Sequence, residues 1–326
     1  MKLRNILFIF GILGLALVVL LNGHQLDSFW LLLKSLRWYI VILIVLIQLA
    51  SYYLNALYYR SILKVFSRSV KVERLFEGAL AANFVNYIIP TMGLAGAGYL
   101  SQVLSPEVPR GESVLAQLMR YALSGLAVLT LMPVGFILIL FTVHSGQDIT
   151  RATLVASLVV IALAILVIIL IEREMTLRRF ANWLTLRLKR LSASIKIEST
   201  HKLINEFYIG YRIMTKHKRK VLPSYGWSII YIVVEVATFY LTFLAFGKAV
   251  NPGIVIMAYL FANIASIFGG VIFSIGVFEI GMTGTLVALG LPFVLALSAT
   301  TVYRILNLII GLPPGFYFYK KYLPKT

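Results

Sequence analysis

Charged residues in the apolar stretches of this chain are the first candidates for chemistry. Between positions 249 and 303 the only charged residue is Glu279, and Arg304 follows directly. Glu235 is the only charged residue from 221 to 247, and Arg120 lies about two turns inside another apolar segment. A charge at membrane depth costs at least about 2.5–3.5 kcal/mol, so it normally faces a partner or a wet cavity. These residues therefore predict either ion pairs or a polar site.

Glu279 and Arg304 are candidates for each other. One interpretation is a structural ion pair that joins two helices. The other is a headgroup site, in which the forked donors of Arg304 bind a phosphate while Glu279 orients them or exchanges a proton. Arg120 has a simpler alternative, because a long side chain near the end of a span can reach the membrane surface.

An apolar stretch around position 90 is interrupted by residues that break helices. Pro90 is followed by Gly93 and Gly96, which either line a cavity or let neighbouring helices pack closely. Three amides lie near this stretch and its later counterpart, and they could cap broken helices or contact a substrate: Asn83, Asn86 and Asn263.

Composition restricts the class of protein. The chain has 60% hydrophobic and only 13% charged residues, which indicates an integral membrane protein. Cysteine is absent and the four histidines are scattered, so we expect no metal site and no cofactor. The net charge is +18, and thirteen Lys or Arg against four Glu between 172 and 222 supply half of it. Basic residues beside membrane spans indicate anionic lipid headgroups rather than nucleic acid.

Six segments are long and apolar enough to be expected as spans: roughly 6–21, 38–59, 114–141, 152–171, 223–247 and 293–319. The first resembles a signal peptide but lacks a small-x-small cleavage pattern, so a retained anchor is expected. Segments 72–106 and 253–291 remain. All basic clusters reach the cytoplasmic side only if both segments enter and leave the bilayer on one face. We therefore predict two re-entrant hairpins and cytoplasmic termini.

The two hairpin segments belong to a repeat with a constant step of 180 residues. The step pairs residues 82–83 with 262–263, 114–116 with 294–296 and Gly96 with Gly276, and it matches the Pro-x-Gly-Phe motifs at 133 and 313. The alternative is that these matches are coincidental, because a chain composed of few apolar residue types matches itself easily by chance. The expected fold is an all-α polytopic membrane protein with about six spans and two re-entrant broken-helix hairpins arranged as an inverted repeat, which places a binding site where the hairpins meet.

The whole chain, 1–326, is expected to be a single transmembrane domain. Repeat one covers about 38–141, a cytoplasmic amphipathic basic segment covers 172–222, and repeat two covers about 223–319. The basic segment has apolar residues at three- and four-residue steps, which predicts a helix on the membrane surface. It is either a gate that captures lipid or a linker held by anionic lipids.

At these residues the chain resembles the flippase-like transmembrane region of lysylphosphatidylglycerol synthases and its stand-alone relatives. The motifs are Asn86-x-x-x-Pro90-x-x-Gly93-x-x-Gly96, Gly276-Val277-Phe278-Glu279 and Tyr303-Arg304. The resemblance implies a multi-pass protein of the prokaryotic cytoplasmic membrane that moves a lipid between leaflets, with Glu279, Arg304, Asn86 and Pro90 in its site. Some relatives have an Arg shortly after the glycines, where this chain has Tyr99-Leu100-Ser101.

Three functions are weighed. A flippase or transporter would move an anionic or aminoacylated phospholipid, or a lipid-linked phosphate. An intramembrane enzyme is not expected, because the sequence has no Cys nucleophile, metal cluster or paired carboxylates. No synthase domain follows position 326, so we expect the chain not to make an aminoacylated lipid. A non-transporting scaffold or accessory subunit for a separate lipid synthase is the remaining alternative.

Overall fold

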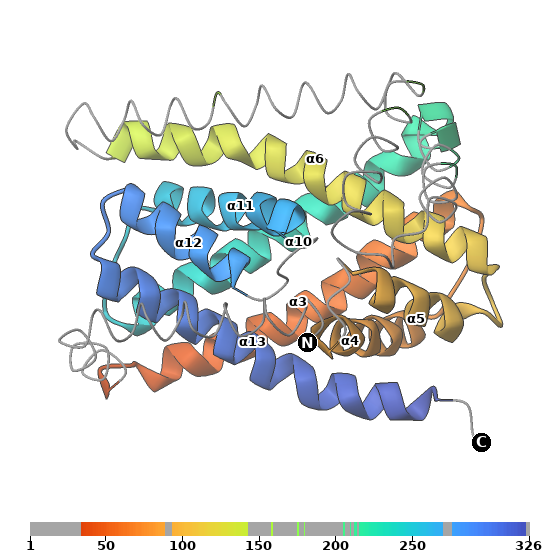
Figure 1. Ribbon diagram of the computed structural model, residues 1–326, viewed down its shortest axis with the longest axis horizontal. Coiled ribbons are helices and arrows are strands. Elements are labelled where there is room, and N and C mark those ends of the chain that lie inside the picture. The colour runs from red at the N-terminus through yellow and green to blue at the C-terminus, as the bar shows by residue number, and fades with distance from the viewer. Residues whose placement is uncertain are drawn as a thin grey trace.

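The computed structural model describes residues 34–88, 93–142, 215–269 and 276–323, with a few single positions between 158 and 213. The regular secondary structure of these described residues is entirely helical, with no strand (Figure 1). Their helices are α3 (Trp38–Val65), α4 (Val72–Ile88), α5 (Leu94–Leu104), α6 (Arg110–Thr142), α10 (Lys218–Ala245), α11 (Pro252–Gly269), α12 (Val277–Ala288) and α13 (Phe293–Lys321).

Four of these helices, α3, α6, α10 and α13, are long and apolar enough to cross a membrane. They correspond to four of the six expected spans. The expected spans 6–21 and 152–171, and most of the basic segment 172–222, lie outside the described residues. Each observed helix extends past its apolar stretch; α10, for example, begins at Lys218 rather than at 223. Helical hydrogen bonding continues beyond the apolar residues, so composition alone underestimates helix length.

The remaining four helices form two hairpins, α4 with α5 and α11 with α12. Their arms contain 17, 11, 18 and 12 residues. At 1.5 Å per residue the shorter arms measure only about 17–18 Å, against about 30 Å for the hydrocarbon core of a bilayer. The arms coincide with the segments predicted to be re-entrant. The turns of both hairpins, including Pro90, lie outside the described residues.

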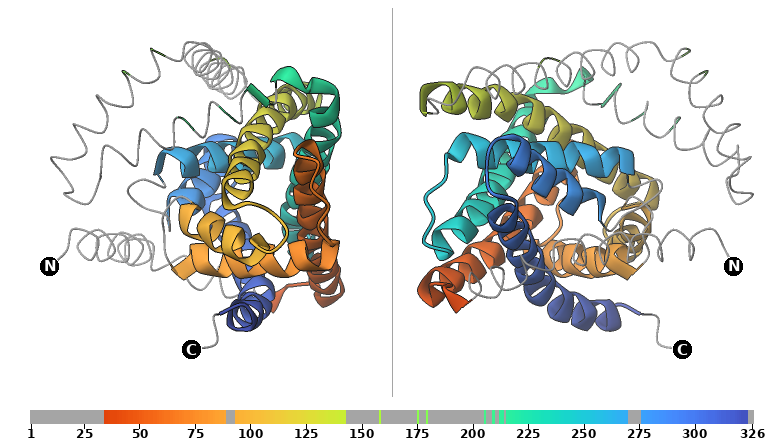
Figure 2. Two further views of the ribbon diagram at one scale, coloured as in Figure 1. Left: turned by 90° about the vertical axis from the view of Figure 1, so that its right-hand side faces the viewer. Right: turned by 60° about the vertical axis from the view of Figure 1, so that its left-hand side comes forward.

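Helices α3 and α10 form an antiparallel pair and lie side by side (Figure 2). The Arg37 amide, just before α3, donates to the Ala245 carbonyl at the end of α10 at 2.8 Å. At the opposite ends, the hydroxyls of Ser61 and Ser224 are 2.9 Å apart. The two helices start 180 positions apart, since 38 + 180 = 218, and they end 180 positions apart, since 65 + 180 = 245.

The outer long helices pack on the hairpin of the other half of the sequence. Gly135 of α6 lies against α11, where a Cβ would be 2.8 Å from Ile256 Cγ2. Gly315 of α13 lies against α4, where a Cβ would be 2.8 Å from the Leu80 carbonyl oxygen. Both glycines come from the repeated Pro-x-Gly-Phe motif. Small residues here allow close approach of helices, as is common in membrane proteins.

Large apolar side chains also cover the outside of the long helices. On α3, exposed residues recur at four- and three-residue steps: Trp38, Ile42, Leu46, Leu49 and Tyr53. Residues with this spacing share one helix face. Such a continuous apolar stripe would be a liability in water and suits contact with lipid tails.

Candidate functional site

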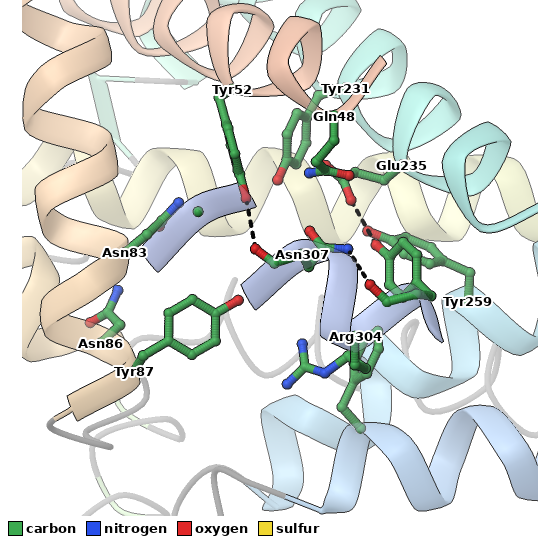
Figure 3. A pocket seen from close by; sticks show the side chains of 13 residues that line it. Gln48, Tyr52, Asn83, Asn86, Tyr87, Tyr231, Glu235, Tyr259, Arg304 and Asn307 are labelled. Carbon is green, nitrogen blue, oxygen red and sulfur yellow. Dashed lines mark hydrogen bonds between the residues drawn. The ribbon is translucent and has the colours of Figure 1, made fainter. Parts of the chain in front are cut away.

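A cavity of about 290 Å³ is lined by the long helices α3, α10 and α13 and by both hairpins (Figure 3). Its lining consists mainly of tyrosine and amide side chains: Gln48, Tyr52, Asn83, Asn86, Tyr87, Tyr231, Glu235, Tyr259, Phe278, Tyr303, Arg304, Asn307 and Gly311. Those from α3, α10 and α13 belong to the middle third or so of each helix. The cavity therefore lies near the mid-height of the long helices.

Glu235 of α10 is the buried acid of this cavity, with 4% of its surface exposed. Its Oε1 accepts from Gln48 Nε2 at 3.2 Å and also from the Ser51 hydroxyl. Its Oε2 accepts from the Tyr303 hydroxyl at 2.7 Å. Among the described residues, Glu235 takes part in none of the salt bridges. The carboxyl is held by neutral donors from both α3 and α13.

Arg304 of α13 is the cation of the cavity, and the predicted pairing with Glu279 is present. Arg304 Nε donates to Glu279 Oε1 at 2.5 Å, and both side chains are about one quarter exposed. The guanidinium also lies 4.9 Å from the centre of the Phe278 ring. Figure 3 shows it extending toward the side of the cavity where Tyr87 lies. Glu279 itself is not a lining residue.

Glu279 also holds the start of α12. Its Oε2 accepts from the Gly276 amide at 2.9 Å, which satisfies a donor at the helix N-terminus. Gly276 has φ +106°, a conformation that glycine adopts without strain. One carboxylate thus joins α13 to the second hairpin at the point where that hairpin breaks.

The three predicted asparagines have different roles. Asn86 lines the cavity, and its Oδ1 accepts from the Gly96 amide at 2.7 Å, so it caps the first turn of α5 from the opposite arm. Asn83, one turn earlier on α4, also lines the cavity. Asn263 is outside the lining and donates to the Tyr259 carbonyl within its own helix at 2.8 Å.

The glycines near Asn86 serve hairpin geometry and are not lining residues. Gly93 has φ +83° at the start of α5, and a Cβ there would be 1.9 Å from the Tyr121 hydroxyl. At Gly96 a Cβ would be 2.4 Å from the Ala82 carbonyl oxygen. Close packing, one of the two interpretations of these glycines, therefore describes their contacts.

Arg120 lies apart from the cavity and faces α3. Its Nη1 donates to Asn55 Oδ1 at 3.2 Å, and its guanidinium lies 5.1 Å from the ring centre of Tyr59 and 5.3 Å from that of Tyr121. Its Nε is buried without a partner. The expected alternative, a side chain that reaches the membrane surface, is wrong, because polar and aromatic groups of α3 and α6 hold the guanidinium inside.

Several lining residues were not predicted from the sequence: Gln48, Tyr52, Tyr87, Tyr231, Tyr259, Phe278, Asn307 and Gly311. A signal was present in their spacing. Polar residues four apart in apolar helices supply the cavity as pairs, such as Gln48 with Tyr52 and Tyr231 with Glu235. Residues four apart share a helix face, so these pairs could have been found by searching apolar spans for them.

The site offers an arginine, a buried carboxyl and hydroxyl and amide groups, which suits binding of a polar headgroup. No group of three His, Cys, Asp or Glu that could hold a metal ion occurs within the described part of the chain.

The family model described as lysylphosphatidylglycerol synthase TM region matches residues 6–315. No curated protein and no solved structure gave a match.

Proposed function

The chain belongs to the lysylphosphatidylglycerol synthase transmembrane-region family, and from this premise we propose that it moves a phosphate-bearing lipid between the leaflets of the cell membrane. Its family and its apolar helices identify it as a membrane protein. Transport, rather than synthesis of the lipid, is our proposal. The observation that carries it is Arg304 in a polar cavity near the mid-height of the long helices.

Arg304 suits a phosphate because its planar fork of donors can form two parallel charge-assisted bonds. The hydroxyls of Tyr87 and Tyr231 and the amides of Asn83 and Asn307 offer further donors in the same cavity. A headgroup that left water for this site would exchange its hydration for these groups, while its acyl chains stayed in the bilayer. This exchange is what lowers the barrier to movement of a charged headgroup across hydrocarbon.

We further propose that the two halves form an inverted repeat, with hairpins entering from opposite faces. The antiparallel α3 and α10 with their 180-residue spacing support this arrangement. So do the reciprocal contacts of Gly135 and Gly315 with the hairpin of the other half. In duplicated transporters, broken helices meet at a midplane site and the halves rock against each other.

Glu279 would then couple binding to motion. A phosphate at Arg304 competes with the Glu279 carboxylate, which also caps α12 through Gly276. Displacing Glu279 loosens the link between α13 and the second hairpin. Its return expels the phosphate and restores the link, so the same ion pair serves as a latch that opens when a headgroup is bound.

Reconstitution of the purified protein into liposomes with a panel of acyl-labelled lipids tests the proposal. We expect lipids with a phosphate headgroup to move between leaflets, and Arg304→Met to abolish the movement. Arg74→Met is the matched control, because Arg74 pairs with Glu107 outside the cavity. Movement that survives Arg304→Met would contradict the site, and a wild type that moves none of the lipids would favour the alternative, a scaffold for a separate lipid synthase.

A further inference from the structure

The charges around the cavity do not balance once a headgroup is bound. Arg304 is neutralised by Glu279, while Glu235 has no cationic partner among the described residues. A phosphate at Arg304 would place a second negative group in the same cavity. Like charges in a poorly solvated site repel strongly. If the proposed transport function holds, something positive has to accompany the phosphate.

The Glu235 end of the cavity has one buried acceptor that receives no hydrogen bond. Gln48 is 1% exposed and directs its Nε2 to Glu235, while its Oε1 is buried without a partner. A buried acceptor without a donor is costly, so such an atom in a cavity wall indicates a missing ligand. Tyr52, Tyr231 and Tyr259 line the same cavity and add oxygens and π-faces (Figure 3).

The acid belongs to one half only. The position 180 residues before Glu235 is 235 − 180 = 55, which is the neutral Asn55. Asn55 accepts from Arg120 and is not a lining residue. Of these two corresponding positions, only the one that lines the cavity has a carboxyl. Packing of α3 against α10 therefore does not by itself require an acid there.

We propose that Glu235 and Gln48 bind a monovalent cation together with the headgroup phosphate at Arg304. Carboxylate, amide and hydroxyl oxygens suit a hard cation, and tyrosine faces attract cations as well. The cation has two sources with this same chemistry. It is either a free alkali ion, or an ammonium group carried by the lipid headgroup itself.

Transport in proteoliposomes distinguishes the sources. Labelled phosphatidylglycerol, which has no ammonium, should move in sodium or potassium chloride and stop when bulky N-methyl-D-glucamine replaces the alkali ion. Labelled phosphatidylethanolamine should move in all three salts. A requirement for alkali ions with both lipids would assign the site to the free ion alone. The proposal would be overturned if both lipids moved at equal rates in all three salts and the rates depended only on pH.

A second measurement on the detergent-solubilised protein does not depend on transport. A cation that binds only the folded state raises the midpoint of thermal unfolding. Sodium chloride should raise it above the N-methyl-D-glucamine value in the wild type and in Glu77→Gln, a control that removes a carboxylate from a surface pair with Lys321. Glu235→Gln should lose this shift. A cation shift without lipid movement would refute transport and leave the cation site standing.

Gln48→Leu covers the case in which Glu235→Gln does not fold. It keeps the carboxylate and removes the unpartnered Oε1. The sodium concentration that gives half of the thermal shift should rise in this variant. An unchanged concentration would contradict the assignment of Gln48 as a ligand.

Discussion

At the scale of single residues, two carboxylates in different environments serve the site: Glu235 lines the cavity, and Glu279 pairs with Arg304 from outside the lining. Glu279 has a cation and a helix N-terminus as partners, so its charge is compensated twice. Glu235 has only neutral donors and is almost completely buried. Two adjacent residues of α13 bind the two carboxylates: Tyr303 donates to Glu235, and Arg304 donates to Glu279.

The latch role of Glu279 can be separated from a purely structural pair. Glu279→Gln keeps an oxygen for the Gly276 amide but no longer competes for Arg304. We expect tighter retention of phosphate lipids by the purified protein and loss of movement between leaflets, at normal membrane abundance. Mass spectrometry of the purified protein measures lipid retention, and a liposome assay measures movement between leaflets.

The double variant Glu279→Gln with Arg304→Met provides the contrast. For a structural pair, removing one partner strands a partly buried charge, which costs at most about 3–5 kcal/mol, and neutralising both restores stability and movement together. We expect the double variant to fold and to remain inactive. Full movement in that variant would leave helix packing as the function of the pair.

At the scale of elements, the first hairpin depends on a close contact between its own arms. Gly96 of α5 approaches the Ala82 carbonyl of α4, and the Asn86 side chain bridges the arms at the same place. The second arm of each hairpin, with 11 residues in α5 and 12 in α12, is too short to cross a bilayer singly. The mutual packing of the arms therefore determines where the cavity wall with Asn83 and Tyr87 lies.

Two alanine substitutions in α5, two positions apart, test this contact. Gly96→Ala places a Cβ 2.4 Å from a backbone oxygen and should destabilise the protein by about 1–3 kcal/mol. Gly98→Ala has nothing within 4 Å and should be neutral or stabilising by up to about 1 kcal/mol, because alanine favours the helix. Unfolding midpoints in detergent measure both. Equal midpoints would show that the arms separate without cost.

At the scale of the whole molecule, the two halves of the sequence share one asymmetric site. The outer helix of each half packs on the hairpin of the other, and α3 and α10 form the seam between them. The two charged lining residues, Glu235 and Arg304, nevertheless come from α10 and α13, both in the second half, as does Glu279, the partner of Arg304. The first half contributes mainly tyrosines and amides, including Tyr52, Asn83 and Tyr87.

The proposed topology predicts on which side of the membrane each connection lies. Ser105 follows α5 and is exposed, and Ala249 follows α10 and is exposed. We expect Ser105→Cys to be cytoplasmic and Ala249→Cys to face outward. The chain has no native cysteine, so an impermeant maleimide applied to intact cells should label only Ala249→Cys. Labelling of Ser105→Cys from outside would mean that α4 and α5 carry the chain across the bilayer.

The sequence by itself determined the membrane class, four helices long and apolar enough to cross a membrane, the segments of the hairpin arms and the Glu279–Arg304 pair. These properties follow from composition, from the length of apolar runs and from the scarcity of charges, which leaves a buried ion few partners. The pair was predictable because the 249–303 stretch offers Arg304 no other acid. Its role in binding remains a prediction.

Only the tertiary structure decided which neutral residues surround Glu235 and where Arg120 and the glycines lie. Gln48 and Glu235 are 187 positions apart, and their contact depends on how α3 and α10 cross and how each is rotated about its axis. A rotation by one residue would turn Tyr52 or Tyr231 away from the cavity, since adjacent positions differ by about 100° around a helix. Apolar periodicity is weak in spans that are hydrophobic on all faces, so this rotation is set by contacts between distant segments.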